Sequence, residues 1–335
     1  MLLAGDIGGT KTALAAYSHG RDANPRSPLV ETTYPSAQYP SLEAIVRAFE
    51  AQTGLRFDHA TFGVSGPVIE GSATITNLPW QMSEAQLSAA TGIPSVRLLN
   101  DLEAIAHGVT VLAPEDLHTL NAGHPAPHAT TLAVIAPGTG LGEAFITREH
   151  GRATAHASEG GHCDFAPTDA LQIGLLKYLG SNGEHVSYER VCSGIGLPNI
   201  YAYLKASGYA QEPDWLAAQL ATTDAPTRAI VNAATDEQRP CTLCMATINT
   251  FVSILGAEAG NLALKVLATG GVYIGGGIPP HILRFLEDPR FLAAFQRKGR
   301  FAELLARIPV RVILNPKVAL IGAAQHGLDL LSRDE

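Results

Sequence analysis

The chain has few cysteines, few charged residues and few aromatic residues. Of its 335 residues, four are cysteine, 16% are charged and 6% are aromatic. Because cysteines are so sparse, we expect reduced thiols, no disulfide framework and a cytoplasmic protein. Acidic residues outnumber basic ones, 31 to 23, and no basic stripe is present. This charge balance argues against nucleic acid as a partner.

Long apolar runs are also missing. The most apolar stretches, such as 252–255 and 318–324, are interrupted by polar or small residues, so we expect no membrane-spanning segment. Asp6 interrupts the first apolar run, and we therefore expect no signal peptide. A chain of this length suits two domains of about 100–200 residues each. Strand-like runs alternating with amphipathic helices favour an α/β fold.

Two glycine-rich turns are the most informative features that the sequence does contain. One is Gly8-Gly9-Thr10-Lys11-Thr12, preceded by Asp6, and the other is Gly138-Thr139-Gly140. Each lies between two strand-like segments. Glycines allow backbone N–H groups to converge on one point, which suits phosphate oxygens. The pair predicts a duplicated phosphate-binding hairpin, with a carboxylate in the first copy only, because Ala136 occupies the position equivalent to Asp6.

Other glycine motifs fit this sequence less well. A P-loop requires glycine directly before its lysine and a helix after it, whereas Thr10 precedes Lys11 and a strand-like segment follows. Neither turn, nor Gly275-Gly276-Gly277, has the spacing of the dinucleotide-binding fingerprint. A nicotinamide-dependent dehydrogenase is therefore not favoured.

The local pattern predicts a series of strands and helices in two lobes. In the first lobe, strands are expected near 2–7, 12–17, 29–34, 59–64 and 95–99, with helices near 41–53 and 83–91. In the second, a helix is expected over about 241–268, strands over 271–275 and 310–314, and a terminal helix over about 318–331. Residues 114–130 are rich in Pro, His, Asn and Gly. We therefore expect lobes of 1–115 and 116–335, with the terminal helix able to pack on the smaller lobe.

Several polar residues follow strand-like or glycine-rich segments and are candidates for chemistry. Asn100 and Asp101 end a buried strand and begin a helix, where either can cap the helix and Asp101 can accept a proton from a hydroxyl group. Glu159 and His162 flank two glycines, and such a pair can bind vicinal hydroxyls of a sugar. The Cys241 and Cys244 pair has no second close pair, so a helix start is favoured over a zinc or redox site.

Taken together, these motifs resemble those of bacterial glucokinases, in the superfamily of hexokinase, actin and the heat-shock-chaperone ATPases. The likeness covers essentially the whole chain. It rests on six motifs that follow one another in the order typical of that family: 5–10, 99–102, 137–142, 159–165, 189–194 and 275–278. The resemblance implies two duplicated ribonuclease-H-like lobes with a cleft between them, ATP-dependent phosphorylation of the 6-hydroxyl of glucose, Mg²⁺ carried by the nucleotide, and a homodimer.

The resemblance also implies roles for individual residues. Asp101 would be the general base, Asn100, Glu159, His162 and Glu189 would hold sugar hydroxyls, and Asp6 would lie near magnesium through water, with no direct protein ligand to the metal. The nucleotide would be held by the two hairpins and by a third glycine turn: Asp6, Gly8, Gly9, Thr10, Lys11, Thr12, Gly138, Thr139, Gly140, Gly275, Gly276 and Gly277.

Some features leave alternatives open. Lys11 and the segment 77–80 are similar to the sister group of sugar kinases and repressors called ROK, but the Cys-rich zinc motif of that group is missing. The substrate could then be mannose, fructose or an amino sugar. A sugar-responsive regulator would need a DNA-binding segment before the first hairpin, and only a few residues precede it. A chaperone-like or filament-forming ATPase would not need Glu159 and His162.

Overall fold

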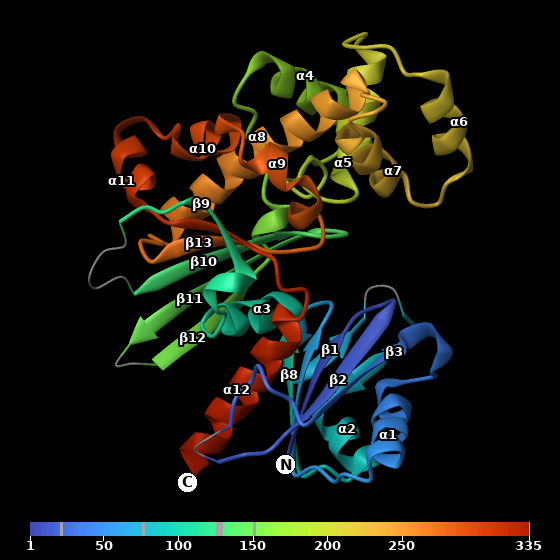
Figure 1. The fold of residues 1–335 in the computed structure, drawn as a ribbon, viewed down its shortest axis with the longest axis vertical. Helices are drawn as coiled ribbons and strands as arrows, with labels where there is room; N and C mark the ends of the chain where they lie inside the picture. Colours follow the sequence, from blue (N-terminus) through green and yellow to red (C-terminus); the bar gives the residue numbers. More distant parts are fainter. Residues whose placement is uncertain (21–22, 76–77, 125–129, 150–151, 335) are drawn as a thin grey trace. The chain divides into compact units, whose positions relative to one another are not determined.

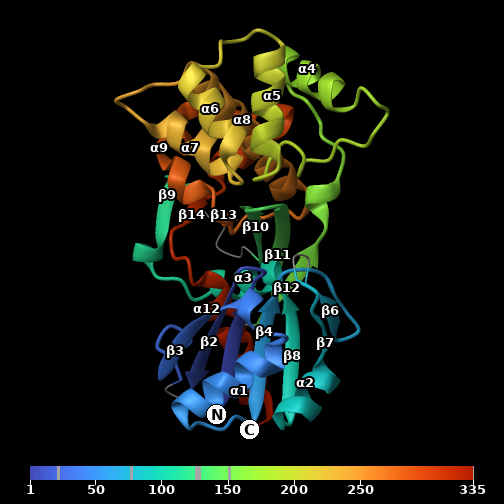
Figure 2. The same cartoon turned by 90° about the vertical axis from the view of Figure 1, so that its right-hand side faces the viewer.

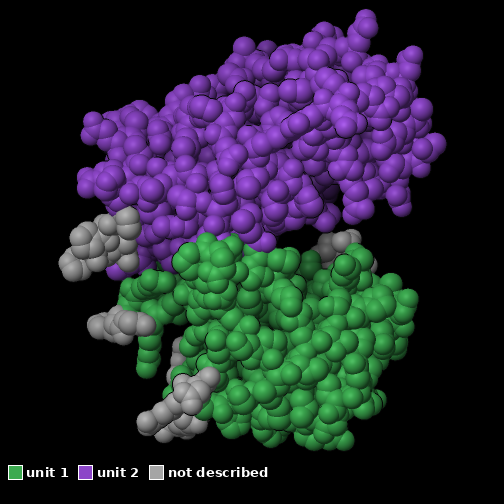
Figure 3. Space-filling model, viewed as in Figure 1, with its two compact units in different colours: residues 1–116, 144–157, 315–335 green, residues 117–143, 158–314 purple. Residues whose placement is uncertain are grey.

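The protein was analysed as a computed structural model that describes residues 1–20, 23–75, 78–124, 130–149 and 152–334. Asn77, part of the ROK-like segment, and residues 125–129 of the expected crossing lie outside the described residues. The chain forms two compact units, coloured separately in Figure 3. The first contains residues 1–116, 144–157 and 315–335, and the second contains residues 117–143 and 158–314.

The first unit is built on a five-stranded sheet with the order β3-β2-β1-β4-β8. β1 pairs antiparallel with β2 and parallel with β4, and β4 pairs parallel with β8. The strands are β1 (Leu2–Ile7), β2 (Lys11–Tyr17), β3 (Val30–Pro35), β4 (His59–Val64) and β8 (Ser95–Asn100). Its helices are α1 (Leu42–Thr53), α2 (Glu84–Thr91), α3 (Asp101–Val109) and α12 (Val318–Asp334). All of the elements expected in this lobe are confirmed.

Helices cover both faces of this sheet (Figures 1 and 2). Successive side chains of a strand point to opposite faces, and in the central strands both sets are largely apolar, so that each face requires a cover. Leu3 and Ile7 belong to a core that includes Ile45 and Phe49 of α1. Leu2, Ala4, Ala15 and Tyr17 pack on the other side with Leu320, Ala323 and Ala324 of α12. A separate small sheet contains β5 (Val68–Ile69), β6 (Ser72–Thr74) and β7 (Gln81–Ser83).

The second unit contains most of a six-stranded sheet with the order β12-β11-β10-β13-β14-β9. Its strands are β9 (Leu117–Asn121), β10 (Thr131–Pro137), β11 (Leu141–Glu149), β12 (Arg152–Ser158), β13 (Gly271–Ile274) and β14 (Val310–Ile313). In both sheets the first strand lies between a second and a fourth, so the order third-second-first-fourth-fifth occurs twice and β9 is added at one edge. The expected duplication is thus a duplication of topology.

Helices make up most of the remaining second unit. They are α4 (Ala170–Leu179), α5 (Gly196–Ala206), α6 (Asp214–Thr222), α7 (Pro226–Thr235), α8 (Thr242–Lys265), α9 (Leu283–Leu286), α10 (Pro289–Gln296) and α11 (Ala302–Arg307). Short 3₁₀ helices are η1 (Ser36–Gln38), η2 (Pro114–Asp116), η3 (Gly160–His162), η4 (Pro279–Ile282) and η5 (Gly299–Phe301). α8 runs through the core between α5, α7 and α10 (Figure 1).

α8 is long and apolar enough to cross a membrane, the one such helix in the described part of the chain. Most of it is buried inside the second unit, and a core helix passes the same test of length and composition. Its first turn follows Cys241, whose Sγ accepts a hydrogen bond from the Cys244 backbone N–H at 3.5 Å. The helix start predicted at this cysteine pair is confirmed, and all four cysteines are free thiols.

The units differ from the sequence-based lobes of 1–115 and 116–335 in two segments. Residues 315–335 belong to the first unit because α12 packs on α3 and β1. Residues 144–157 also belong to it, and Arg148 and Arg152 line a cavity there together with Gln325 of α12. The packing of the terminal helix on the smaller lobe agrees with the expectation from the sequence, whereas no local signal indicated that residues 144–157 belong to the first unit.

Candidate functional site

The first glycine turn, between β1 and β2, is held from behind by a serine that the sequence did not indicate. Gly8 N–H donates to the Lys11 carbonyl at 2.9 Å and closes the turn. Ser36 of η1 donates its hydroxyl to the Gly8 carbonyl at 2.7 Å and its N–H to the Thr10 carbonyl at 3.1 Å. Thr12 is buried with its hydroxyl 2.9 Å from that of Ser36, whereas Thr10 and Lys11 are exposed. Thr12 therefore supports the turn from inside.

Asp6 and Asp101 lie close enough for their charges to interact. Asp6 is near the end of β1 beside Gly63 of β4, and Asn100 ends β8 beside Val64 of the same strand. Burial, and then the negative charge of Asp101, raise the pKa of Asp6 to about 6. The fold thus brings these two carboxyl groups near one another within the first unit.

Asn100 is the N-cap of α3. Its Oδ1 accepts from the Leu102 N–H at 2.9 Å, and its Nδ2 donates to the Gly66 carbonyl at 3.0 Å. Asp101 Oδ1 accepts from the same Leu102 N–H at 2.9 Å. Since a side-chain amide offers two donors and two acceptor lone pairs, Asn100 keeps one of each for a ligand.

The second glycine turn, between β10 and β11, is braced by two other segments of the second unit. Gly138 N–H donates to the Gly140 carbonyl at 2.9 Å, and the Gly138 carbonyl accepts from Gly194 N–H at 2.8 Å. Ile195 N–H donates to the Thr139 carbonyl at 3.3 Å. Residues 193–195, at the start of α5, therefore fix the turn.

The third glycine turn packs directly on the same hairpin. Gly275 N–H donates to the Ile135 carbonyl at 2.9 Å, which extends the β10–β13 pairing. Gly276 has a φ of +84°, and a Cβ atom there would overlap the Pro137 carbonyl oxygen. Glycine is thus required at position 276 both for its conformation and for its close approach to β10.

Glu189 connects the second hairpin to the Glu159–His162 loop. Its Oε2 accepts from the Leu141 N–H at 3.0 Å, and its own N–H donates to the Gly161 carbonyl at 2.8 Å. A Cβ atom on Gly140 would overlap this carboxylate. Glu189 is therefore part of the architecture of the loop in addition to being a candidate ligand, a role that the sequence did not indicate.

Glu159 and His162 lie at the two ends of η3 with their side chains exposed. The side chains are 69% and 60% exposed, and His162 Nε2 is 3.9 Å from Glu159 Oε2. Between them, Gly160 and Gly161 are buried, and a Cβ atom on Gly161 would overlap the Leu141 carbonyl oxygen. The buried glycines anchor the loop and leave both polar side chains available to a ligand.

A cavity of about 800 Å³ opens beside the second and third glycine turns, within the second unit. Thr227, at the start of α7, donates its hydroxyl to the Gly194 carbonyl and so joins the cavity wall to the hairpin. Most of the other lining residues carried no signal in the sequence. The cavity is lined by Gly138, Thr139, Gly194, Ile195, Pro198, Asn199, Asp224, Ala225, Pro226, Thr227, Arg228, Val231, Asn232, Gly277, Ile278 and His281.

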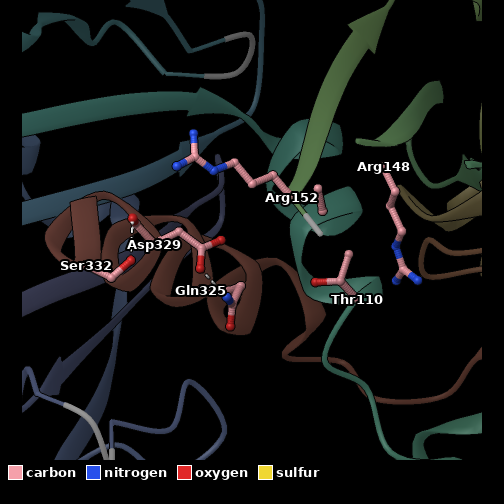
Figure 4. Close-up of a pocket in the computed structure, with 7 residues that line it drawn as sticks. Thr110, Arg148, Arg152, Gln325, Asp329 and Ser332 are labelled. Carbon is pink, nitrogen blue, oxygen red and sulfur yellow. Dashed lines mark hydrogen bonds between the residues drawn. The ribbon is translucent and has the colours of Figure 1, made fainter. Parts of the chain in front are cut away.

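A second cavity, of about 610 Å³, lies in the first unit and is shown in Figure 4. Gln325, Asp329 and Ser332 of α12 form one wall, and Gln325 donates to Asp329 at 2.7 Å. Arg148 and Arg152 point in different directions in this view, so their charges do not converge on one point. None of the predicted site residues lines this cavity.

The predicted site residues thus form two sets, one in each unit. Asp6, the first glycine turn, Asn100 and Asp101 come together in the first unit. In the second unit, Glu189 and the backbone contacts join the second hairpin, the Glu159–His162 loop and the third glycine turn. Among the described residues, no cluster of three or more His, Cys, Asp or Glu side chains could hold a metal ion.

Comparisons with known proteins point to one family. The family profile described as Glucokinase matches residues 3–329. The glucokinase of Nostoc punctiforme is 40% identical over 338 residues, which cover 97% of this chain and 98% of that protein. The crystal structure of a glucokinase from an Antarctic psychrotroph is 30% identical, with a TM-score of 0.83 and 98% of each chain covered.

A more distant solved structure shows the fold alone. The ROK family glucokinase from Streptomyces griseus, in complex with glucose and AMPPNP, is 21% identical with a TM-score of 0.63, covering 98% of this chain and 99% of that one. The resemblance predicted from the motifs and the actin-like α/β fold are confirmed. The family profile matches nearly the whole chain, and the chain is similar to glucokinases both in sequence and in three-dimensional structure. It therefore belongs to the glucokinase family.

Proposed function

We propose that this protein transfers the γ-phosphoryl group of ATP to the 6-hydroxyl of glucose, with Asp101 as the general base. The observation that carries the assignment of the base is the position of Asp101 at the start of α3, beside Asp6 and the first glycine turn. Membership of the glucokinase family supplies the reaction. No observation favours mannose, fructose or an amino sugar over glucose.

The environment of Asp101 suits a proton acceptor. A carboxylate can act as a base only in its ionised form. Asp101 Oδ1 accepts a hydrogen bond from the Leu102 N–H, and the N-terminus of α3 places a partial positive charge beside this carboxyl group. Asp101 would take the proton of the sugar hydroxyl as its oxygen attacks the terminal phosphorus of ATP.

Sugar recognition is assigned to Asn100, Glu159, His162 and Glu189. Asn100 has one donor and one acceptor left after capping α3, and Glu159 and His162 are exposed on an anchored loop. Carboxylates, an imidazole and an amide together supply both acceptors and donors for a set of hydroxyls. A site made of such groups discriminates strongly against water, because water leaves most of them unpaired. The Streptomyces griseus relative binds glucose, which supports this assignment.

Nucleotide binding is assigned to the three glycine turns and to the cavity of the second unit. Gly8 to Thr12 and Gly138 to Gly140 would hold the phosphates through backbone N–H groups. Gly275, Gly276 and Gly277 would line the adenosine side, and the cavity of about 800 Å³ beside Gly277 has the size of a small-molecule site. The same relative binds AMPPNP, an ATP analogue by its name.

Magnesium fits the first unit as an ion carried by ATP. The pKa of Asp6 is raised first by burial and then by the negative charge of Asp101, and a nearby cation would favour the ionised forms of both carboxyl groups. Asp6 would hold the hydrated ion through water, and Mg²⁺ keeps several of its waters in such sites. When bound, the ion neutralises phosphate charge, while positioning is left to the residues described above.

The proposal also includes the cellular compartment, the oligomeric state and the use of the product. The free thiols are consistent with a reducing, cytoplasmic compartment. A homodimer follows from the family resemblance, and glucose 6-phosphate would be the product supplied to glycolysis.

The proposal is tested by measuring ADP release with ATP, Mg²⁺ and a panel of hexoses. We expect glucose to give the highest kcat/KM, and Asp101→Asn to reduce kcat by about 10²- to 10⁴-fold with little change in the dissociation constant of glucose. Glu115→Gln, which alters an exposed carboxylate of the same unit, is the matched control. Near-normal turnover of Asp101→Asn would remove Asp101 from the role of base.

A further inference from the structure

Glu143 is a buried acidic residue that the proposed mechanism does not use. It lies on β11, directly after the second glycine hairpin, and only 1% of its surface is exposed. Its Oε1 atom is buried, and among the described residues no group donates a hydrogen bond to it. An ionised carboxylate without a donor is very costly in such a place, so this side chain requires an explanation.

The group that does face Glu143 is a second buried carboxyl, that of Glu258 on α8. Glu258 already has donors of its own. Lys265 Nζ lies 3.1 Å from its Oε1, and Asn261 Nδ2 donates to its Oε2 at 2.8 Å. Glu258 is therefore the member of the pair whose negative charge is compensated.

Two carboxyl groups can form a hydrogen bond with each other only if one of them carries a proton. Burial, followed by the negative charge of Glu258, raises the pKa of Glu143 to about 8, while Lys265 acts in the opposite direction. The hydrogen-bond geometry and the direction of the pKa shift agree. Glu143 is the side chain without a donor, and it is also the one whose protonated form is favoured.

The carboxyl of Glu143 also lies directly beneath the Glu159–His162 loop. A Cβ atom on Gly160 would overlap Glu143 Oε2, and one on Gly161 would overlap the Leu141 carbonyl oxygen. The loop is therefore seated on residues 141–143, with no space for a side chain between them. A movement of the Glu143 side chain would be transmitted to Gly160.

We propose that Glu143 is a positioning residue that shares one proton with Glu258 and, through this neutral contact, holds the Glu159–His162 loop in place for sugar binding. The second half of this statement rests on the proposed function of the loop. Loss of the shared proton would place two negative charges side by side under Gly160 and displace the loop. Glu143 itself touches neither substrate in this proposal.

Other ionisable groups face the pair from every neighbouring segment. α8 contributes Lys265. The segment that follows α10 contributes Lys298, which donates to the Asn261 side chain at 2.6 Å. Tyr188 and Cys192 face the pair from the segment before α5, and burial, with Glu258 as the next cause, raises the pKa of both. Cys163, beside the loop, interacts with Lys265. Both lysines interact with Glu258, and Lys265 also interacts with Glu143, but the hydrogen bond of Lys265 goes to Glu258 and, among the described residues, none reaches Glu143 Oε1.

The shared proton is tested by thermal unfolding of the intact protein between about pH 5.5 and 9. Because the folded state raises the pKa of Glu143 from 4.5 to about 8, the stability that Glu143 contributes is complete below the lower value and is lost as the pH rises through the higher one. Glu143→Gln cannot titrate at this position. The Tm of the variant minus the Tm of wild type should therefore increase as the pH is raised from about 5.5 to 9. Glu149→Gln, an exposed acid on the same strand, should show a constant difference. A constant difference for Glu143→Gln would overturn the shared proton.

The positioning role is tested by steady-state kinetics of three variants. Glu143→Leu, similar in size but unable to form the hydrogen bond, should raise the KM for glucose by about tenfold or more and change kcat much less. Glu143→Gln should keep a KM near that of wild type and should not show the increase in KM that wild type shows above about pH 8. An unchanged KM in Glu143→Leu would overturn the positioning role, and unchanged KM values in Glu159→Ala and His162→Ala would instead overturn the sugar site itself. The unfolding experiment does not depend on either result.

Discussion

The folded protein disfavours the ionised form of Asp6. Its pKa of about 6 has two causes, burial and the neighbouring Asp101. A carboxylate in this state is suited to a site that receives a positive charge with its substrate. The sequence predicted a distinct role for Asp6, because the second hairpin has alanine at the equivalent position. It did not predict that the pKa of Asp6 would be raised.

We expect Asp6→Asn to be more heat-stable than wild type at about pH 7.5 and to lose that advantage near pH 4. The folded state raises the pKa of Asp6 from 3.8, so the stability that Asp6 contributes is present below that value and is lost as the pH rises through about 6. Differential scanning calorimetry without ligands measures the difference. A stabilisation that does not vary with pH would show that ionisation of Asp6 is not its cause.

Glu189 and Glu159 are both assigned to sugar binding, but only Glu189 also has a structural role, as the acceptor for the Leu141 N–H. Glu189→Ala should raise the KM for glucose and also destabilise the protein by about 1–3 kcal/mol, because it leaves the buried Leu141 N–H without its acceptor. Glu159→Ala should raise the KM alone, since its side chain is 69% exposed. Urea unfolding and steady-state kinetics on the two variants make the comparison. Equal stabilities would mean that the contact between Glu189 and Leu141 contributes nothing to folding.

At the scale of elements, the contact between α3 and α12 determines where Asp101 is held. The two helices approach so closely that a Cβ atom on Gly322 would overlap the Ala104 carbonyl oxygen, and one on Gly108 would overlap that of Val318. His107 and His326 add a hydrogen bond of 3.1 Å across the same contact. α3, which carries Asp101 at its N-terminus, is therefore supported along its middle and C-terminal part by a helix from the other end of the chain.

Gly322→Ala should destabilise the protein by about 1–3 kcal/mol, because the added methyl group has no space between the helices. At an open helical position the same change stabilises by up to about 1 kcal/mol, so the sign of the effect is informative. We also expect kcat to fall, since α3 must shift. Chemical denaturation provides the measurement, and a stabilised Gly322→Ala would contradict the close packing.

Elements in the first unit were predicted well because their signals are local. Alternating apolar residues in 2–7 and 59–64, and the cap at Asn100, each depend on neighbours in the sequence. In the second unit, α4 to α7 were not predicted as separate helices. Several residues of α5 and α7, such as Pro198 and Val231, line a cavity. α5 and α7 pack against α8, whereas α4 packs on α5 and α6 packs on α7. Which helices meet in this way is not specified by any local pattern in the sequence.

At the scale of the whole molecule, neither unit is continuous in the sequence. The first unit contains both ends of the chain, and α12 covers the apolar side chains of Leu2, Ala4, Ala15 and Tyr17. A chain ending at residue 314 should therefore leave that sheet face uncovered, with loss of cooperative folding of the first unit. Hydrogen exchange of the β1 and β2 amides tests this, with removal of residues 333–335 as the control. Native protection in the shorter chain would show that α12 is dispensable.

The sequence by itself determined most strands of the two larger sheets, the glycine turns, the family and the candidate base, because a turn, a cap or an alternating strand depends on residues that are neighbours along the chain. Only the tertiary structure decided that Ser36 braces the first turn, that Glu189 bridges the second hairpin to the sugar loop, that α12 supports the helix of Asp101, and that Glu143 meets Glu258. These are contacts between segments far apart in the sequence. They exist only once the chain has folded, and burial then sets their energies.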